Sequence, residues 1–162
     1  MKNLAFIDGQ NLYMSTIKCD WKIDHIKFRI YLKDKYNVEN AYYFIGYHSE
    51  DEDKLYKKLE SAGFILVFKN HGKFLSFKKK GNVDIDIVFH IMKNLFENIN
   101  FDKVILVSGD GDYFGLVKYL IEKNRFYKIL LPNKATASSL YKRLRTSRFD
   151  YLDNLKVYIE YK

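Results

Sequence analysis

The chain has 162 residues, 48% of them hydrophobic, and a formal net charge of +8. This length suits one domain, and the absence of an apolar run of about 20 residues excludes a membrane-spanning helix. The single cysteine, Cys19, excludes an intramolecular disulfide and a cysteine-based zinc site, and it fits a reducing cytoplasm. The positive charge favours a polyanionic partner such as a nucleic acid, but it also suits simple solubility.

Strand-length apolar runs alternate with segments of helical periodicity. In chain order we expect a strand at 3–7, a helix at 10–18, a helix capped by Asp24, a strand at 41–45, a helix at 50–62 and a strand at 65–68. After a polar loop or small hairpin at 70–82 come a helix at 83–99, a strand at 104–107, a helix at 113–123, a strand at 128–131, a helical segment at 138–145 and a strand at 157–161. This alternation predicts a single three-layer α/β domain with a mainly parallel central sheet.

Two acidic motifs directly follow predicted strands. Asp8 comes after the first strand, and Asp110 and Asp112 come after the strand at 104–107. Ligands of parallel sheets bind beyond the carboxyl ends of the strands, so these carboxylates are expected at one rim. Asp110 and Asp112 repel each other and are best tolerated with a cation between them. Taken alone, Asp8 is equally well explained as a helix N-cap.

A third acidic element lies in the helix predicted at 83–99. At about 100° per residue, Asp84 falls in the middle of the apolar face. Asp86 points nearly the opposite way and shares a polar face with His90. We therefore expect Asp84 to join the other carboxylates, Asp86 to be a solvated residue and His90 to be an ordinary surface histidine. A carboxylate directed at the core requires a cation or hydrogen bonds.

The resulting constellation contains only carboxylates: Asp8, Asp84, Asp110 and Asp112. Oxygen ligands of this kind select the hard cations Mg²⁺ or Mn²⁺ over zinc. Such a cation can activate water and stabilise charge on a phosphoryl group. In a basic chain this indicates phosphodiester hydrolysis.

Three motifs together resemble the NYN family, a branch of the PIN-like nuclease superfamily. The matching segments are FIDGQNLY (6–13), KGNVDIDI (80–87) and VSGDGDYFGLV (107–117), with a weaker match at 138–152. The resemblance covers nearly the whole chain, and it implies a Rossmann-like, PIN-like fold that cleaves RNA with Mg²⁺ or Mn²⁺. By position, the four aspartates match the family's acidic residues. Asn11 matches the polar residue beside the first aspartate, and Ser108 matches the hydroxyl of the SGD turn.

The sequence departs from the family pattern at two positions. His90 and Ser147 stand where many members carry a further aspartate. Tyr113, next to Asp112, is more simply explained by core packing than by stacking on a base. Basic residues just before the helix that carries Asp84, and others after the strand at 128–131, are interpreted as contacts to the RNA backbone or as solvated charge. They are Lys80, Lys134, Lys142, Arg143, Arg145 and Arg148.

Several functions remain open at this point. A ribonuclease is favoured, and a catalytically weak or inactive RNA-binding module of the same fold is the alternative. A phosphatase acting on small substrates is less favoured, because Gly9-Gln10 stands where it would carry a second aspartate. RNA is the expected partner, no membrane partner is expected, and a homodimer is left open.

Overall fold

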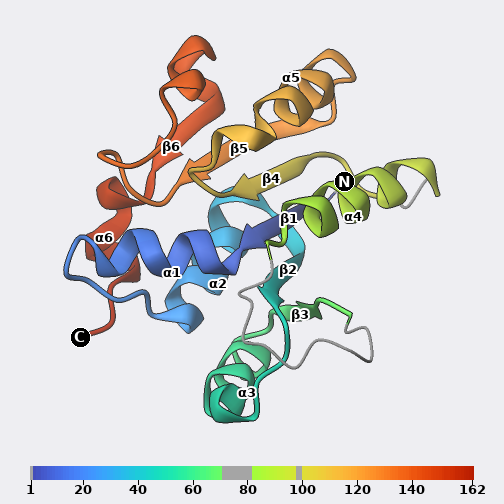
Figure 1. The fold of residues 1–162 in the computed structure, drawn as a ribbon. Coiled ribbons are helices and arrows are strands. Elements are labelled where there is room, and N and C mark those ends of the chain that lie inside the picture. Colours follow the sequence, from blue (N-terminus) through green and yellow to red (C-terminus); the bar gives the residue numbers. More distant parts are fainter. Residues whose placement is uncertain (1, 71–81, 98–99) are drawn as a thin grey trace.

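The computed structural model describes residues 2–70, 82–97 and 100–162, which build one six-stranded sheet in the order β3-β2-β1-β4-β5-β6 (Figure 1). Every pair of neighbouring strands is parallel, which confirms the predicted α/β fold. The strands are β1 (Asn3–Asp8), β2 (Val38–Gly46), β3 (Ile65–Phe68), β4 (Val104–Val107), β5 (Phe126–Leu131) and β6 (Phe149–Tyr151).

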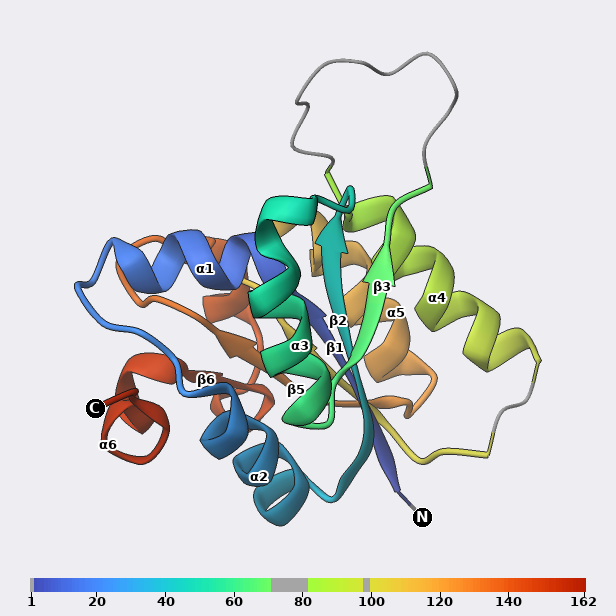
Figure 2. The ribbon, with the colours of Figure 1, turned by 90° about the horizontal axis from the view of Figure 1, so that it is seen from below.

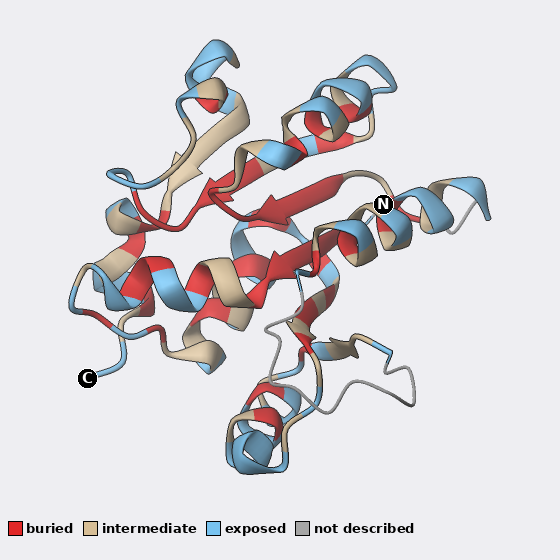
Figure 3. Ribbon diagram, viewed as in Figure 1, coloured by how far each residue is buried: buried red, intermediate tan, exposed pale blue. Residues whose placement is uncertain are grey.

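Helices cover both faces of the sheet (Figure 2). The α-helices are α1 (Gly9–Ile17), α2 (His25–Tyr36), α3 (Asp53–Ser61), α4 (Asp84–Phe96), α5 (Phe114–Glu122) and α6 (Lys156–Ile159). Short 3₁₀ segments are η1 (Glu50–Glu52), η2 (Gly111–Tyr113), η3 (Ser139–Arg143), η4 (Thr146–Arg148) and η5 (Leu152–Leu155). Two hydrophobic clusters result, one under α1, α2, α3 and α6 and the other under α4, α5 and η3. The central strands between them are buried (Figure 3).

Local sequence signals explain where several elements begin and end. The Asp24 carboxylate accepts a hydrogen bond from the Lys27 backbone N–H, so it caps α2 as predicted. Asn37 ends that helix in the left-handed conformation, with φ of 51°. Gly63, after α3, has φ of 93°, a conformation that favours glycine. The expected loop or hairpin at 70–82 lies mostly outside the described residues.

The C-terminal part differs from the expectation. The strand predicted at 157–161 is wrong, because α6 occupies most of it. The helical segment predicted at 138–145 is the 3₁₀ segment η3, and the sheet ends with β6, which the sequence analysis missed. The alternating VYIEY pattern resembles a strand, but only Ile159 of α6 is buried, against α2. None of the described helices has the length and apolar character needed to cross a membrane.

The topology places the acidic motifs together. Strands β1 and β4 are adjacent and in register, with Ile7 opposite Val107. Asp8 ends β1, and Ser108 to Asp112 follow the end of β4. Both segments therefore emerge at the carboxyl edge of the sheet, where α4 also begins.

Candidate active site

Asp8 is held at the end of β1 by three hydrogen-bond donors. Its Oδ1 accepts from the Asn11 backbone N–H (3.0 Å), which caps α1. Its Oδ2 accepts from the Ser108 hydroxyl (3.3 Å) and from the Tyr113 hydroxyl (3.2 Å), whose single proton is shared with Asp84. The residue is only 4% exposed. Asp8 is thus both the N-cap and a buried carboxylate at the sheet edge, so the two interpretations of this residue do not exclude each other.

The SGDGD turn after β4 is fixed to the same edge. The Gly109 N–H donates to Asn11 Oδ1 (2.8 Å), which joins the turn to α1. Asp110 caps η2 by accepting from the Asp112 N–H (3.0 Å). The Tyr141 hydroxyl in η3 donates to the Asp110 carbonyl oxygen. These contacts hold the carboxylates of Asp110 and Asp112 on one side of the turn.

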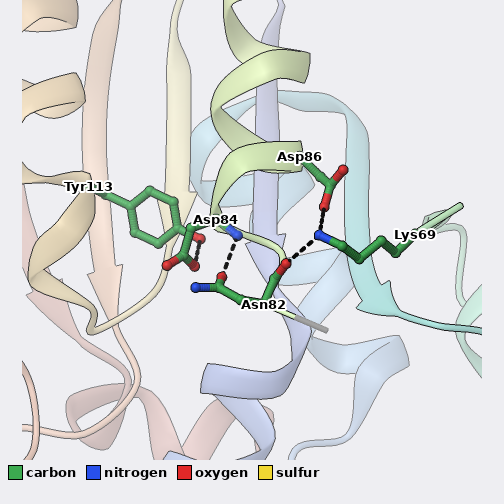
Figure 4. Close-up of polar contacts among 5 residues, drawn as sticks. All are labelled: Lys69, Asn82, Asp84, Asp86 and Tyr113. Atoms are coloured by element: carbon green, nitrogen blue, oxygen red, sulfur yellow. Dashed lines mark hydrogen bonds and ion pairs between the residues drawn. The ribbon is translucent and has the colours of Figure 1, made fainter. Parts of the chain in front are cut away.

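Asp84 is the first residue of α4. Its backbone N–H donates to Asn82 Oδ1 (2.8 Å), and its Oδ1 accepts from the Tyr113 hydroxyl (2.7 Å) (Figure 4). The carboxylate is half-buried. The position at the helix N-terminus agrees with its negative charge, because the helix dipole favours anions there.

Three of the four predicted carboxylates meet directly. One oxygen each from Asp84, Asp110 and Asp112 lies within 4.8 Å of the other two. Asp8 lies behind this group and reaches it through Tyr113, whose hydroxyl contacts both Asp8 and Asp84. A hollow of about 350 Å³ opens beside them, and its walls include Asp8, Asn11, Asp84 and Asp110. The set can hold a cation through oxygen ligands alone.

Burial gives this site an electrostatic cost. It raises the pKa of Asp8 above the ordinary value of 3.8, and the nearby charge of Asp84 raises it further, while the hydrogen bonds to Asp8 act the other way. A bound cation would remove the repulsion between these carboxylates.

We expect Asp8→Asn to stabilise the metal-free protein at neutral pH. A pKa that is higher in the folded state means that the native protein binds more protons than the unfolded chain. The stability of the wild type therefore falls as pH rises through that raised pKa, whereas the amide keeps the N-cap oxygen and does not titrate. Thermal melting in EDTA at several pH values measures this. Equal pH dependence in the two proteins would contradict it.

Tyr113 is the residue that the sequence analysis undervalued. Its side chain is fully buried, as expected for a core residue, but its hydroxyl is the link between Asp8 and Asp84. Burial, followed by the charge of Asp8, raises the pKa of this hydroxyl far above its usual value, so it stays protonated as a donor. The sequence feature that could have indicated this role is the position of Tyr113 directly after Asp112.

We expect Tyr113→Phe to weaken the binding of a metal ion at this site. Without the hydroxyl, Asp84 loses a donor that orients it, and loss of such outer partners typically lowers metal affinity by about 10–100-fold. A Mn²⁺ titration of this binding should show a half-saturating concentration raised at least tenfold. Tyr56→Phe, which removes the buried hydroxyl that accepts from the Ser49 N–H, is the control. An unchanged half-saturating Mn²⁺ concentration in Tyr113→Phe would show that the hydroxyl does not orient Asp84 for metal binding.

The helical projection correctly placed Asp86 and His90 away from the carboxylate group, but neither is the solvated surface residue that was expected. Asp86 points away from Tyr113 and pairs with Lys69 after β3 at 3.0 Å (Figure 4). His90 is not an ordinary surface residue, because its ring lies 5.2 Å from Phe44 and 6.2 Å from Tyr42 on β2. Burial lowers its pKa. These two residues face the neighbouring strands, and the most exposed side of α4 carries Ile85 and Phe89 instead.

The basic residues lie at different places. Lys142, Arg143 and Arg145 are exposed in and after η3, close to Tyr141. The Lys134 N–H donates to Asp153. Arg148 donates to the Phe126 carbonyl (2.6 Å) at the beginning of β5, the edge opposite the carboxylates. Lys80 lies outside the described residues.

Comparison with known proteins supports one family. The NYN domain family profile matches residues 4–149. The low amplitude and bright protein LabA of Synechococcus elongatus is 25% identical over an alignment of 164 positions. The alignment covers 96% of this chain and 86% of LabA. The crystal structure of VPA0982, a protein of unknown function from Vibrio parahaemolyticus, superposes with a TM-score of 0.75 at 21% identity. That match covers 98% of this chain and 95% of the Vibrio chain, so the two share a fold.

Proposed function

Because the chain belongs to the NYN domain family, we propose that it is a metal-dependent ribonuclease that hydrolyses RNA phosphodiester bonds. The observation that carries this proposal is the meeting of Asp84, Asp110 and Asp112, with oxygens within 4.8 Å of one another. Three carboxylates so close together, backed by the buried Asp8, fit a hard cation such as Mg²⁺ or Mn²⁺. The lone Cys19 agrees with action in the cytoplasm.

The side chains of the site have different roles in this proposal. Asp84, Asp110 and Asp112 would hold the cation, which when bound supplies an activated water and neutralises charge on the phosphoryl group. Asp8 and the Tyr113 hydroxyl keep Asp84 oriented. Asn11 and Ser108 fix the geometry between α1 and the turn after β4 through Gly109 and Asp8. Rigid placement of this kind is what positions a reacting phosphate.

The alternative is an RNA-binding module of the same fold with weak or no catalysis. It is favoured by His90, which packs among aromatic rings where many relatives carry an aspartate, and by the exposed Ser147. Incubation of the purified protein with single-stranded and structured RNA in Mn²⁺, Mg²⁺ or EDTA decides between them. Cleavage that requires the metal supports the nuclease, and RNA binding without cleavage under any condition supports the module.

We expect RNA binding to depend on the exposed basic residues after β5. Neutralising Lys142, Arg143 and Arg145 to Gln should weaken binding to unrelated RNA sequences alike. It should also make the slope of log affinity against log salt less steep by about 2, since each lost phosphate contact contributes about 0.7 on single strands. Lys33→Gln with Lys35→Gln, at the end of α2, is the control. If the salt slope is the same in both variants, the η3 segment does not contact the RNA phosphates. Arg148 is left unchanged, because its guanidinium binds backbone carbonyls.

A further inference from the structure

The exposed face of α4 is apolar, whereas the solvent-facing side of a surface helix is ordinarily polar. Ile85, Phe89, Met92 and Phe96 are 78%, 60%, 37% and 88% exposed. Their spacing of four, three and four residues places them on one side of the helix. A contiguous apolar stripe of this kind usually marks a binding surface. Two residues of the stripe, Ile85 and Phe89, line the same hollow as the carboxylates of Asp84 and Asp112.

A hollow of about 440 Å³ joins the beginning of this stripe to the candidate metal site. Ile85, Val88 and Phe89 form its apolar wall, and Asp84 and Asp112 supply its acidic lining. Asn82 also lines it. The Asn82 oxygen accepts from the Asp84 N–H (2.8 Å), and its NH₂ group is a donor of the kind that base edges accept. The hollow is open to solvent, and its apolar side with a few polar groups can support a flat ring on one face.

We infer that this hollow is a nucleobase subsite, in which the base of a nucleotide next to the scissile phosphate stacks on Phe89. The inference rests on the proposed ribonuclease function, and it adds the substrate class. Asp84 and Asp112 belong to both the hollow and the carboxylate group, so a phosphate at the carboxylates brings its own base to this wall. A base can enter only when it has left its stack, so the nucleotide held here is an unpaired one.

Phe89→Ala tests the subsite, with Phe96→Ala as the matched control. Both are exposed phenylalanines of the same stripe, but Phe96 lies about 10 Å farther along the helix axis. Phe89→Ala should lower kcat/KM for single-stranded RNA about tenfold, the usual scale for one stacked base. Phe89→Trp should keep kcat/KM at the wild-type value, and Phe96→Ala should leave kcat/KM unchanged.

A substrate series shows whether a base is what Phe89 contacts. Removing one base at a time from a short RNA should reveal a position where the wild type loses about tenfold and Phe89→Ala loses nothing further. Equal rates for wild type and Phe89→Ala on the intact RNA would overturn the subsite. So would equal loss in Phe89→Ala and Phe96→Ala together with a change in sedimentation, because the stripe would then be an interface between two copies.

The binding of the same RNAs, measured by fluorescence anisotropy in Ca²⁺, separates this inference from the proposed function. If the wild type cleaves no RNA, the nuclease proposal fails. The base subsite then stands if Phe89→Ala weakens binding of the intact RNA about tenfold but leaves binding of the abasic RNA unchanged. It falls if both RNAs bind Phe89→Ala as they bind the wild type.

Discussion

Replacing Asp110 by Asn is expected to reduce metal-dependent RNA cleavage about a hundredfold or more while leaving the fold intact. The variant loses one of the three carboxylates that meet within 4.8 Å, and the loss of one charge-stabilising group commonly costs this much. The amide oxygen of Asn can still accept from the Asp112 N–H, so the cap of η2 is retained. Initial cleavage rates at saturating Mn²⁺ and thermal melting of the same samples measure both effects. Asp8→Asn should also lower cleavage.

Asp86→Asn is the matched control for this experiment. Asp86 lies two residues from Asp84 on α4, but its carboxylate is paired with Lys69 outside the cluster. Loss of a partly exposed ion pair costs at most about 1 kcal/mol, and cleavage should stay within about twofold of the wild type. Full activity in Asp110→Asn would reject the carboxylate site. A similar loss of activity in Asp86→Asn would show that charge on α4, and not the cluster, is responsible.

Gly9→Ala is expected to have the largest effect on stability. A Cβ atom added at Gly9 would lie 2.6 Å from the Phe44 carbonyl oxygen and would also overlap the Tyr43 ring. The carbonyl belongs to the backbone of β2, so it cannot move aside without disturbing the sheet. Overpacking of this kind costs about 3 kcal/mol, which lowers Tm by about 6–12 °C in a chain of this length. Asp8, the preceding residue, would be displaced too, so cleavage should fall.

Gly115→Ala supplies the comparison. It lies in the first turn of α5, and a Cβ atom there meets nothing within 4 Å. Alanine in place of a helical glycine should stabilise the protein by about 0.5 kcal/mol. Melting temperatures of the two variants should therefore move in opposite directions. A Gly9→Ala protein as stable as the wild type would mean that α1 does not pack against β2 this closely.

Much of the site was readable from the sequence, because the relevant signals are local. An apolar run followed by Asp8-Gly9, and another followed by the SGDGD turn, mark strand ends, and parallel strands end at one edge. The helical period separated Asp84 from Asp86, and Asp84 meets the cluster while Asp86 pairs with Lys69. The strand–helix alternation predicted the parallel α/β fold that the sheet confirms.

The tertiary structure decided the features that depend on neighbours distant in sequence. The VYIEY pattern alternates like a strand, yet α6 occupies most of it, with Ile159 in the core beside α2. His90 is half-buried because β2 presents Phe44 and Tyr42 beside α4. Tyr113 joins Asp8 to Asp84 across intervals of 105 and 29 residues. Periodicity fixes how side chains are distributed around one element, but which side meets water and which side meets a partner depends on where the other elements pack.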